Sequence, residues 1–125
     1  MEELIREFIS QRRFAVVGAT DNPEKAGNQI VRNLVRRGYE VYPVNPRLKE
    51  VEGMSCYPSL AEVPVKVDVV DVVVPPEVTE KVVEQAKQLG LERIWLQPGA
   101  ESEAAIEFCR RHGLKVVYGV CVMQR

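Results

Sequence analysis

Phe14-Ala15-Val16-Val17-Gly18-Ala19-Thr20 decides the fold, because a short apolar run ends there at a glycine and small residues. An uninterrupted apolar run of this length is typical of a parallel strand that is buried on both faces. A turn without bulky side chains lets backbone N–H groups come close to a phosphate. The stretch therefore predicts the first strand and turn of a nucleotide-binding α/β domain, with Gly18, Ala19 and Thr20 at the ligand.

Apolar runs and helical patterns alternate along the rest of the chain. An amphipathic helix is expected over residues 2–11, and the expected strands are 14–17, 40–44, 67–74, 93–96 and 115–118. Right-handed crossovers then predict one α/β domain over residues 1–125, with a doubly wound sheet of five parallel strands and helices on both faces. The expected strand order is 3-2-1-4-5. Residues 45–66 hold only a short helical turn near Ser59.

Composition excludes several classes of function. Seventeen basic and eighteen acidic residues give a net charge of −1, which argues against nucleic-acid binding by broad phosphate neutralisation. No apolar run approaches the roughly 20 residues that cross a bilayer, and no signal peptide opens the chain, so we expect a cytoplasmic protein without membrane contact. An edge strand offers a place for a second copy, unless the first helix covers it.

Cysteine and histidine do not predict a metal site. The chain has three widely spaced cysteines, Cys56, Cys109 and Cys121. An odd number at such spacing is more typical of free thiols than of a disulfide framework or a zinc site. His112 is the only histidine and precedes a glycine, so it is expected to end a helix.

Ligands of doubly wound sheets bind beyond the carboxyl ends of the strands. The first of these loops lacks the Gly-x-Gly-x-x-Gly fingerprint, but Thr20 offers a hydroxyl and Lys25 a charge. The amides around Asn28 are expected at a helix N-terminus, where anions bind. This loop is therefore the expected phosphate site.

The second and third loops narrow the choice of nucleotide. NAD-binding domains usually end the second strand with an acidic residue, whereas this chain has Asn45, Pro46 and Arg47. Arg47 suits a ribose phosphate, either the 2′-phosphate of NADP or the 3′-phosphate of coenzyme A. The third strand ends in an apolar platform for an adenine ring, formed by Val73, Val74, Pro75 and Pro76.

Six short motifs, which follow one another along the chain, resemble those of a known protein family. They are Val-Val-Gly-Ala-Thr, Val-Tyr-Pro-Val-Asn-Pro, Cys-Tyr-Pro-Ser-Leu, Val-Val-Pro-Pro, Trp-Leu-Gln-Pro-Gly-Ala and Cys-Val-Met. From Phe14 to Met123 the chain resembles the small stand-alone coenzyme A-binding proteins, which are related to the nucleotide-binding domain of the succinyl-CoA synthetase α subunit. The resemblance implies a Rossmann-like domain with the diphosphate of coenzyme A at the first turn and its pantetheine arm near Gln97, Pro98 and Gly99.

The same resemblance does not carry ligase activity with it. Such synthetases use a phosphorylated histidine from a separate domain and a partner subunit, and no motif here matches either. The sequence shows no catalytic constellation, so the leading hypothesis is a module that binds coenzyme A or an acyl-CoA, alone, as a homodimer or beside an enzyme partner. The alternatives are an NADP-binding redox enzyme or sensor, and a mixed disulfide between Cys121 and the ligand thiol.

Overall fold

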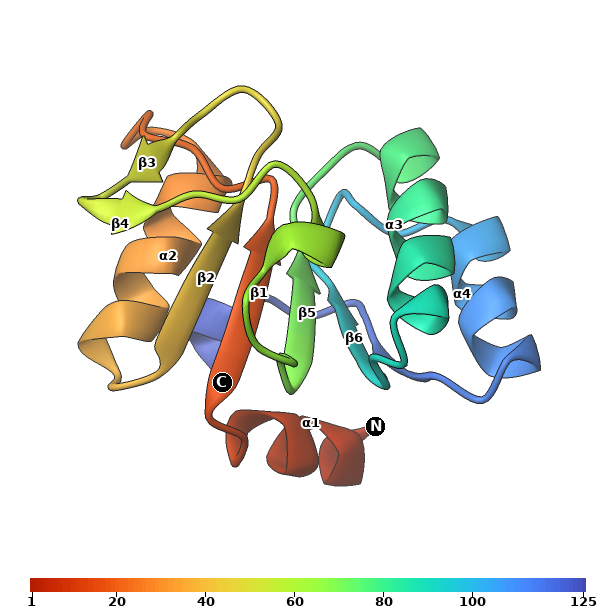
Figure 1. Cartoon of the computed structure of the whole chain (residues 1–125). Coiled ribbons are helices and arrows are strands. Elements are labelled where there is room, and N and C mark those ends of the chain that lie inside the picture. Colours follow the sequence, from red (N-terminus) through yellow and green to blue (C-terminus); the bar gives the residue numbers. More distant parts are fainter.

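The computed structural model describes residues 1–125 and places a parallel sheet between two layers of helices (Figure 1). The strands of this sheet lie in the order β2-β1-β5-β6-β7. Their bounds are β1 Arg13–Val17, β2 Glu40–Val44, β5 Val69–Val72, β6 Arg93–Leu96 and β7 Lys115–Val117. The doubly wound α/β class with five parallel strands is confirmed.

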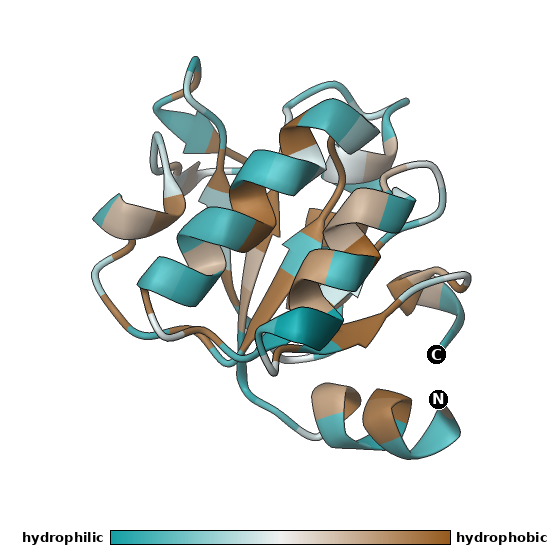
Figure 2. Ribbon diagram, turned by 90° about the vertical axis from the view of Figure 1, so that its right-hand side faces the viewer, coloured by the Kyte–Doolittle hydropathy of each residue, from teal (hydrophilic) through white to brown (hydrophobic).

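Helices cover both faces of the sheet. Their bounds are α1 Glu2–Ile9, α2 Ala26–Arg36, α3 Pro76–Gln88 and α4 Glu103–Arg111, with 3-10 turns η1 Leu60–Glu62 and η2 Val122–Gln124. One buried cluster joins the sheet to α3, α4 and η1, and a second joins it to α1, α2 and η2. Figure 2 shows hydrophobic strands behind helices whose outward sides are hydrophilic. None of the helices is long and apolar enough to cross a membrane.

The expected strand order 3-2-1-4-5 is wrong. The third parallel strand, β5, pairs with β1 rather than with β2, so the order in chain sequence is 2-1-3-4-5. Pro43 explains why β2 is an edge: its carbonyl oxygen faces outward and accepts from the N–H of Tyr57 at 3.0 Å. A proline has no N–H for the ladder on that side, so it belongs in an edge strand.

The chain crosses from β2 to β5 without a full helix. It forms an antiparallel hairpin of β3 (Glu50–Val51) and β4 (Met54–Ser55), which the sequence did not predict. Glu52 and Gly53 both have positive φ, as a tight hairpin turn requires. The expected helical turn near Ser59 is present as η1, and Leu60 packs into the cluster beneath α3. This short crossover leaves room beside α3.

The N-terminal helix confirms the expected amphipathic pattern. Ile5 and Phe8 are buried, and the Phe8 ring lies 6.1 Å from the ring of Trp95. On the polar side, Glu7 pairs with Arg93 at 2.7 Å and with Lys115 of β7 at 2.8 Å. The helix α1 therefore packs against the amino ends of β6 and β7, at the end of the sheet opposite the carboxyl ends of the strands.

Asp71 is a buried acid in the middle of the sheet. Its Oδ1 accepts a hydrogen bond of 2.5 Å from the side-chain amide of Gln97, and its Oδ2 has no partner. Burial raises the pKa of Asp71 to about 7, although the bond from Gln97 opposes this. The carbonyl of the Gln97 side chain in turn accepts from the N–H of Val122 at 3.1 Å. Asp71 thus begins a polar chain that holds the C-terminal segment.

The raised pKa predicts that stability falls as the pH rises. The unfolded chain releases the Asp71 proton near its ordinary pKa of 3.8, whereas the folded protein keeps it to about 7. The contribution of Asp71 to the free energy of unfolding is therefore most favourable below pH about 4. It declines as the pH rises from about 4 to about 7 and then stays constant. Asp71→Asn keeps an acceptor for Gln97 and removes the ionisation, so we expect it to be near neutral in acid and stabilising at pH about 8 by on the order of 4 kcal/mol.

Urea unfolding of both proteins at each pH measures this difference. The comparison cancels the opposite contribution of surface acids such as Glu7, whose pKa is lowered by Lys115 and Arg93. A stability difference that did not change with pH would contradict a buried neutral carboxyl at this position.

Candidate functional site

The strand order fixes where the site lies. The chain leaves β1 for α2 on one face of the sheet, and leaves β5 for α3 on the other. Neighbouring strands whose connections diverge in this way create a crevice at their carboxyl ends. The loops after β1 and β5 therefore form the centre of the candidate site, with the loops after β2 and β6 on either side.

Gly18 lies where three of these loops meet. Its N–H donates to the carbonyl of Val44 at 3.0 Å. A β-carbon at Gly18 would lie 2.4 Å from the carbonyl oxygen of Val73, and the φ of +101° also favours glycine. Only a residue without a side chain allows the turns after β1 and β5 to touch.

Gly27 is a second close contact, which the sequence analysis missed. A β-carbon at Gly27 would lie 2.1 Å from the carbonyl oxygen of Gly18, so the first turn of α2 packs directly on the turn after β1. The last glycine of the dinucleotide fingerprint has the same packing role at another spacing. The glycine is visible in the sequence, but it does not stand at the fingerprint's spacing from Gly18.

The rest of the first loop is held by side chains that point inward. Ala19 is buried, and Asn28 donates to the carbonyl of Thr20 at 2.9 Å and to the carboxylate of Glu52 at 3.0 Å. The side chain of Asn28 thus orders the loop and is 0% exposed. Lys25 is exposed at the N-terminus of α2, and no side chain caps that helix.

The loop after β2 is joined to the first loop by Asn45. Its side-chain amide donates to the carbonyl of Ala19 at 2.8 Å, and its Oδ1 accepts from the N–H of Arg47 at 2.8 Å. The guanidinium of Arg47 is exposed and forms no ion pair. Asn45 therefore fixes the loop, while Arg47 keeps a free charge beside it.

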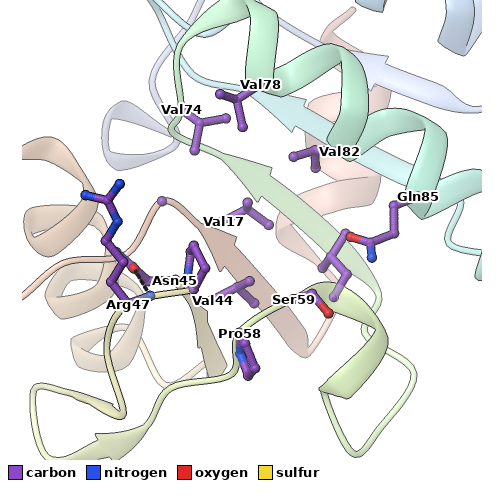
Figure 3. A pocket seen from close by; sticks show the side chains of 13 residues that line it. Val17, Val44, Asn45, Arg47, Pro58, Ser59, Val74, Val78, Val82 and Gln85 are labelled. Carbon is purple, nitrogen blue, oxygen red and sulfur yellow. Dashed lines mark hydrogen bonds between the residues drawn. The ribbon is translucent and has the colours of Figure 1, made fainter.

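A cavity of about 430 Å³ opens between these loops, α3 and η1 (Figure 3). Apolar side chains from β1, β2 and α3 form its walls, and Asn45, Arg47, Ser59 and Gln85 supply its polar groups. It is lined by Val17, Gly18, Val44, Asn45, Pro46, Arg47, Pro58, Ser59, Leu60, Val74, Val78, Val82 and Gln85. Such a volume and lining are typical of a small-molecule site.

A second hollow, of about 370 Å³, lies between the loops after β5 and β6. Its lining residues are Val73, Val74, Pro75, Pro76, Pro98, Gly99 and Ala100. Val74 lines both this hollow and the cavity, so the two are neighbours. The structure thus brings most of the sequence-predicted residues of four loops to one edge of the sheet.

Two residues from the sequence analysis lie differently from the rest. Gln97 is 2% exposed, and its amide is taken up by Asp71 and Val122, so it lines neither hollow. Cys121 is half-buried just before η2. No group of three or more His, Cys, Asp or Glu side chains is arranged to hold a metal ion.

This chain is similar to known proteins of two different lengths. The α subunit of ADP-forming acetate–CoA ligase II from Pyrococcus furiosus is 29% identical over 126 residues, which cover 92% of this chain but 28% of that subunit. Protein YneT of Bacillus subtilis is 29% identical, over 94% of this chain and 88% of YneT. The solved structure of a hypothetical protein from Pyrococcus horikoshii OT3 has a TM-score of 0.94 at 38% identity, over 99% of this chain and 88% of that one.

The chain therefore spans less than a third of the ligase subunit, but most of the two smaller proteins. Residues 12–125 match the family described as CoA binding domain, which is nearly the whole sequence. This chain belongs to the CoA binding domain family.

Proposed function

We propose that this protein is a cytoplasmic module that binds coenzyme A or an acyl-CoA along the carboxyl edge of its sheet. The observation that carries the proposal is the pair of adjoining hollows on either side of Val74, one with a free arginine at its rim. A long ligand with an aromatic base, phosphates and a flexible arm needs such a continuous path. The family to which the chain belongs supports the same ligand.

The larger cavity takes the adenosine end of the ligand. Val17, Val74 and Val78 offer an apolar surface to the adenine ring, and Gln85 and Ser59 offer hydrogen bonds to its edge. Arg47, on the rim, pairs with the 3′-phosphate of the ribose, because a guanidinium binds phosphate through paired N–H groups. Apolar walls with a few polar groups are typical of pockets that bind and orient an aromatic base.

The turn after β1 takes the diphosphate. Gly18, Ala19 and Thr20 present mainly backbone there, and the uncapped N-terminus of α2 lies beside them with Lys25. Unpaired amides and the helix dipole at such an end favour anions. The pantetheine arm then runs over Val73–Pro76 into the second hollow, toward Pro98 and Gly99.

We assign binding rather than ligation to this chain. The ligase relative is much longer, and the chain matches 28% of it. Binding to an enzyme partner or to a second copy belongs to the same proposal. The first test is calorimetric titration with coenzyme A and with NADPH: we expect coenzyme A to bind the tighter, and a preference for NADPH would favour the redox alternative.

Arg47→Ala tests the placement of the 3′-phosphate. We expect coenzyme A to bind about tenfold more weakly, because one charge-assisted contact is lost, while 3′-dephospho-coenzyme A is nearly unaffected. Arg36→Ala is the matched control, since Arg36 is another exposed arginine and lies in the last turn of α2. Equal losses for both ligands in Arg47→Ala would reject this role of Arg47.

Val78→Gln tests the adenine pocket. Val78 lines the cavity and is 40% exposed, so a polar side chain there costs little stability. We expect it to weaken coenzyme A about fivefold, through lost apolar contact with the base. Val35→Gln is the control, because Val35 is a helix valine of similar exposure, 45%, that lines a different hollow. Similar affinities for the two variants would place the adenine elsewhere.

A further inference from the structure

The second hollow is apolar inside and acidic at its edge. None of its seven lining residues is charged. The carboxylate of Glu101 lies next to it and accepts a 2.8 Å hydrogen bond from the N–H of Gly99, one of the lining residues. The hollow therefore has a carboxylate fixed on one of its own backbone donors.

Two more carboxylates lie on the neighbouring helix α3. Glu77 follows the lining residue Pro76 in the first turn of α3. Glu80, one turn further, accepts a 3.0 Å hydrogen bond from the hydroxyl of Ser102, which begins α4. The nearest lysine on α3, Lys81, lines another hollow with Glu84 and Gln88. None of Glu77, Glu80 and Glu101 forms a salt bridge with a lysine or arginine, so this edge keeps its negative charge.

The opposite end of the site has the opposite sign. Arg47 lines the larger cavity and has no carboxylate partner. A ligand with phosphates at one end and a thiol or thioester at the other fits this polarity in one direction only. The phosphates lie near Arg47, and the acyl group lies near Glu101.

We propose that Glu101 determines specificity, so that the site accepts free coenzyme A and thioesters of uncharged acyl groups but disfavours acyl groups that carry a carboxylate. This inference rests on the proposed function. A carboxylate on the acyl group would lie close to Glu101, and like charges at short range repel. It would also find the N–H of Gly99 already taken.

An uncharged acyl chain meets no such obstacle. Beyond the path of the pantetheine arm, Pro98 and Ala100 offer apolar walls, so an aliphatic chain loses contact with water there. Selection against one class of acyl group through a misplaced charge is a common way for a site to gain specificity.

Butyryl-CoA and succinyl-CoA test the inference, because their acyl chains have equal length and differ in a terminal carboxylate. By calorimetry we expect the native protein to bind butyryl-CoA about tenfold more tightly than succinyl-CoA. Glu101→Gln keeps an acceptor for Gly99 and removes the charge, so the ratio should fall to about threefold or less. Added salt should also reduce the ratio in the native protein.

Glu107→Gln is the matched control, since Glu107 lies on α4 and lines a different hollow with Tyr118. It should leave the ratio unchanged, and thermal unfolding checks that each variant is folded. Equal binding of the two thioesters by the native protein, or an unchanged ratio in Glu101→Gln, would overturn this inference alone. Failure of coenzyme A itself to bind would overturn the proposed function and this inference together.

Discussion

The candidate site depends on one close approach, between the backbone of Gly18 and the carbonyl of Val73. It brings the turns after β1 and β5 into contact at the point where the two crossovers diverge. Gly27 extends the contact to α2, since its own β-carbon position is filled by the carbonyl of Gly18. Strand, turn and helix are thus packed backbone to backbone, which is the geometry that lets main-chain amides reach a phosphate. Any side chain at either glycine would separate these elements.

The shape of the larger cavity follows from the place of β2 at the edge of the sheet. Pro43 offers no N–H on that side and its carbonyl is taken by Tyr57, so β2 suits an edge, and the next parallel strand, β5, lies on the other side of β1. The segment that makes this passage forms only a hairpin and the short η1, so it covers the sheet less completely than a helix would. The space left beside α3 is the cavity, and its walls are the apolar ends of β1 and β2 together with Val78 and Val82 of α3.

The sequence predicted the class of fold and the edge that carries the site, because burial dictates apolar runs and glycines mark the turns. The predicted strand order was wrong, because hydrophobic periodicity reports whether a strand is buried but not which strands lie beside it. Pro43 was the one residue that could have indicated that β2 is an edge strand. The sequence did not predict the hairpin of β3 and β4, because its strands are very short. Within the site, residue types did not tell which side chains face outward. Asn28 and Gln97 were candidates for contact with the ligand, yet both are buried: Asn28 donates to the loop after β1, and Gln97 donates to Asp71 of β5.

The burial of these polar side chains explains the chemical character of the site. The polar residues that look functional in the sequence, including Asn45, are mainly occupied in joining one loop to the next. What remains at the surface of the site is mainly backbone, valine and proline, with Ser59 and Gln85 in the larger cavity and a charge at each end. Such a surface offers shape and backbone dipoles, which are what the proposed binding of a long, mostly apolar ligand uses. In the proposed binding mode the loops supply the shape of the site, and the charges at its two ends, Arg47 and Glu101, supply its specificity.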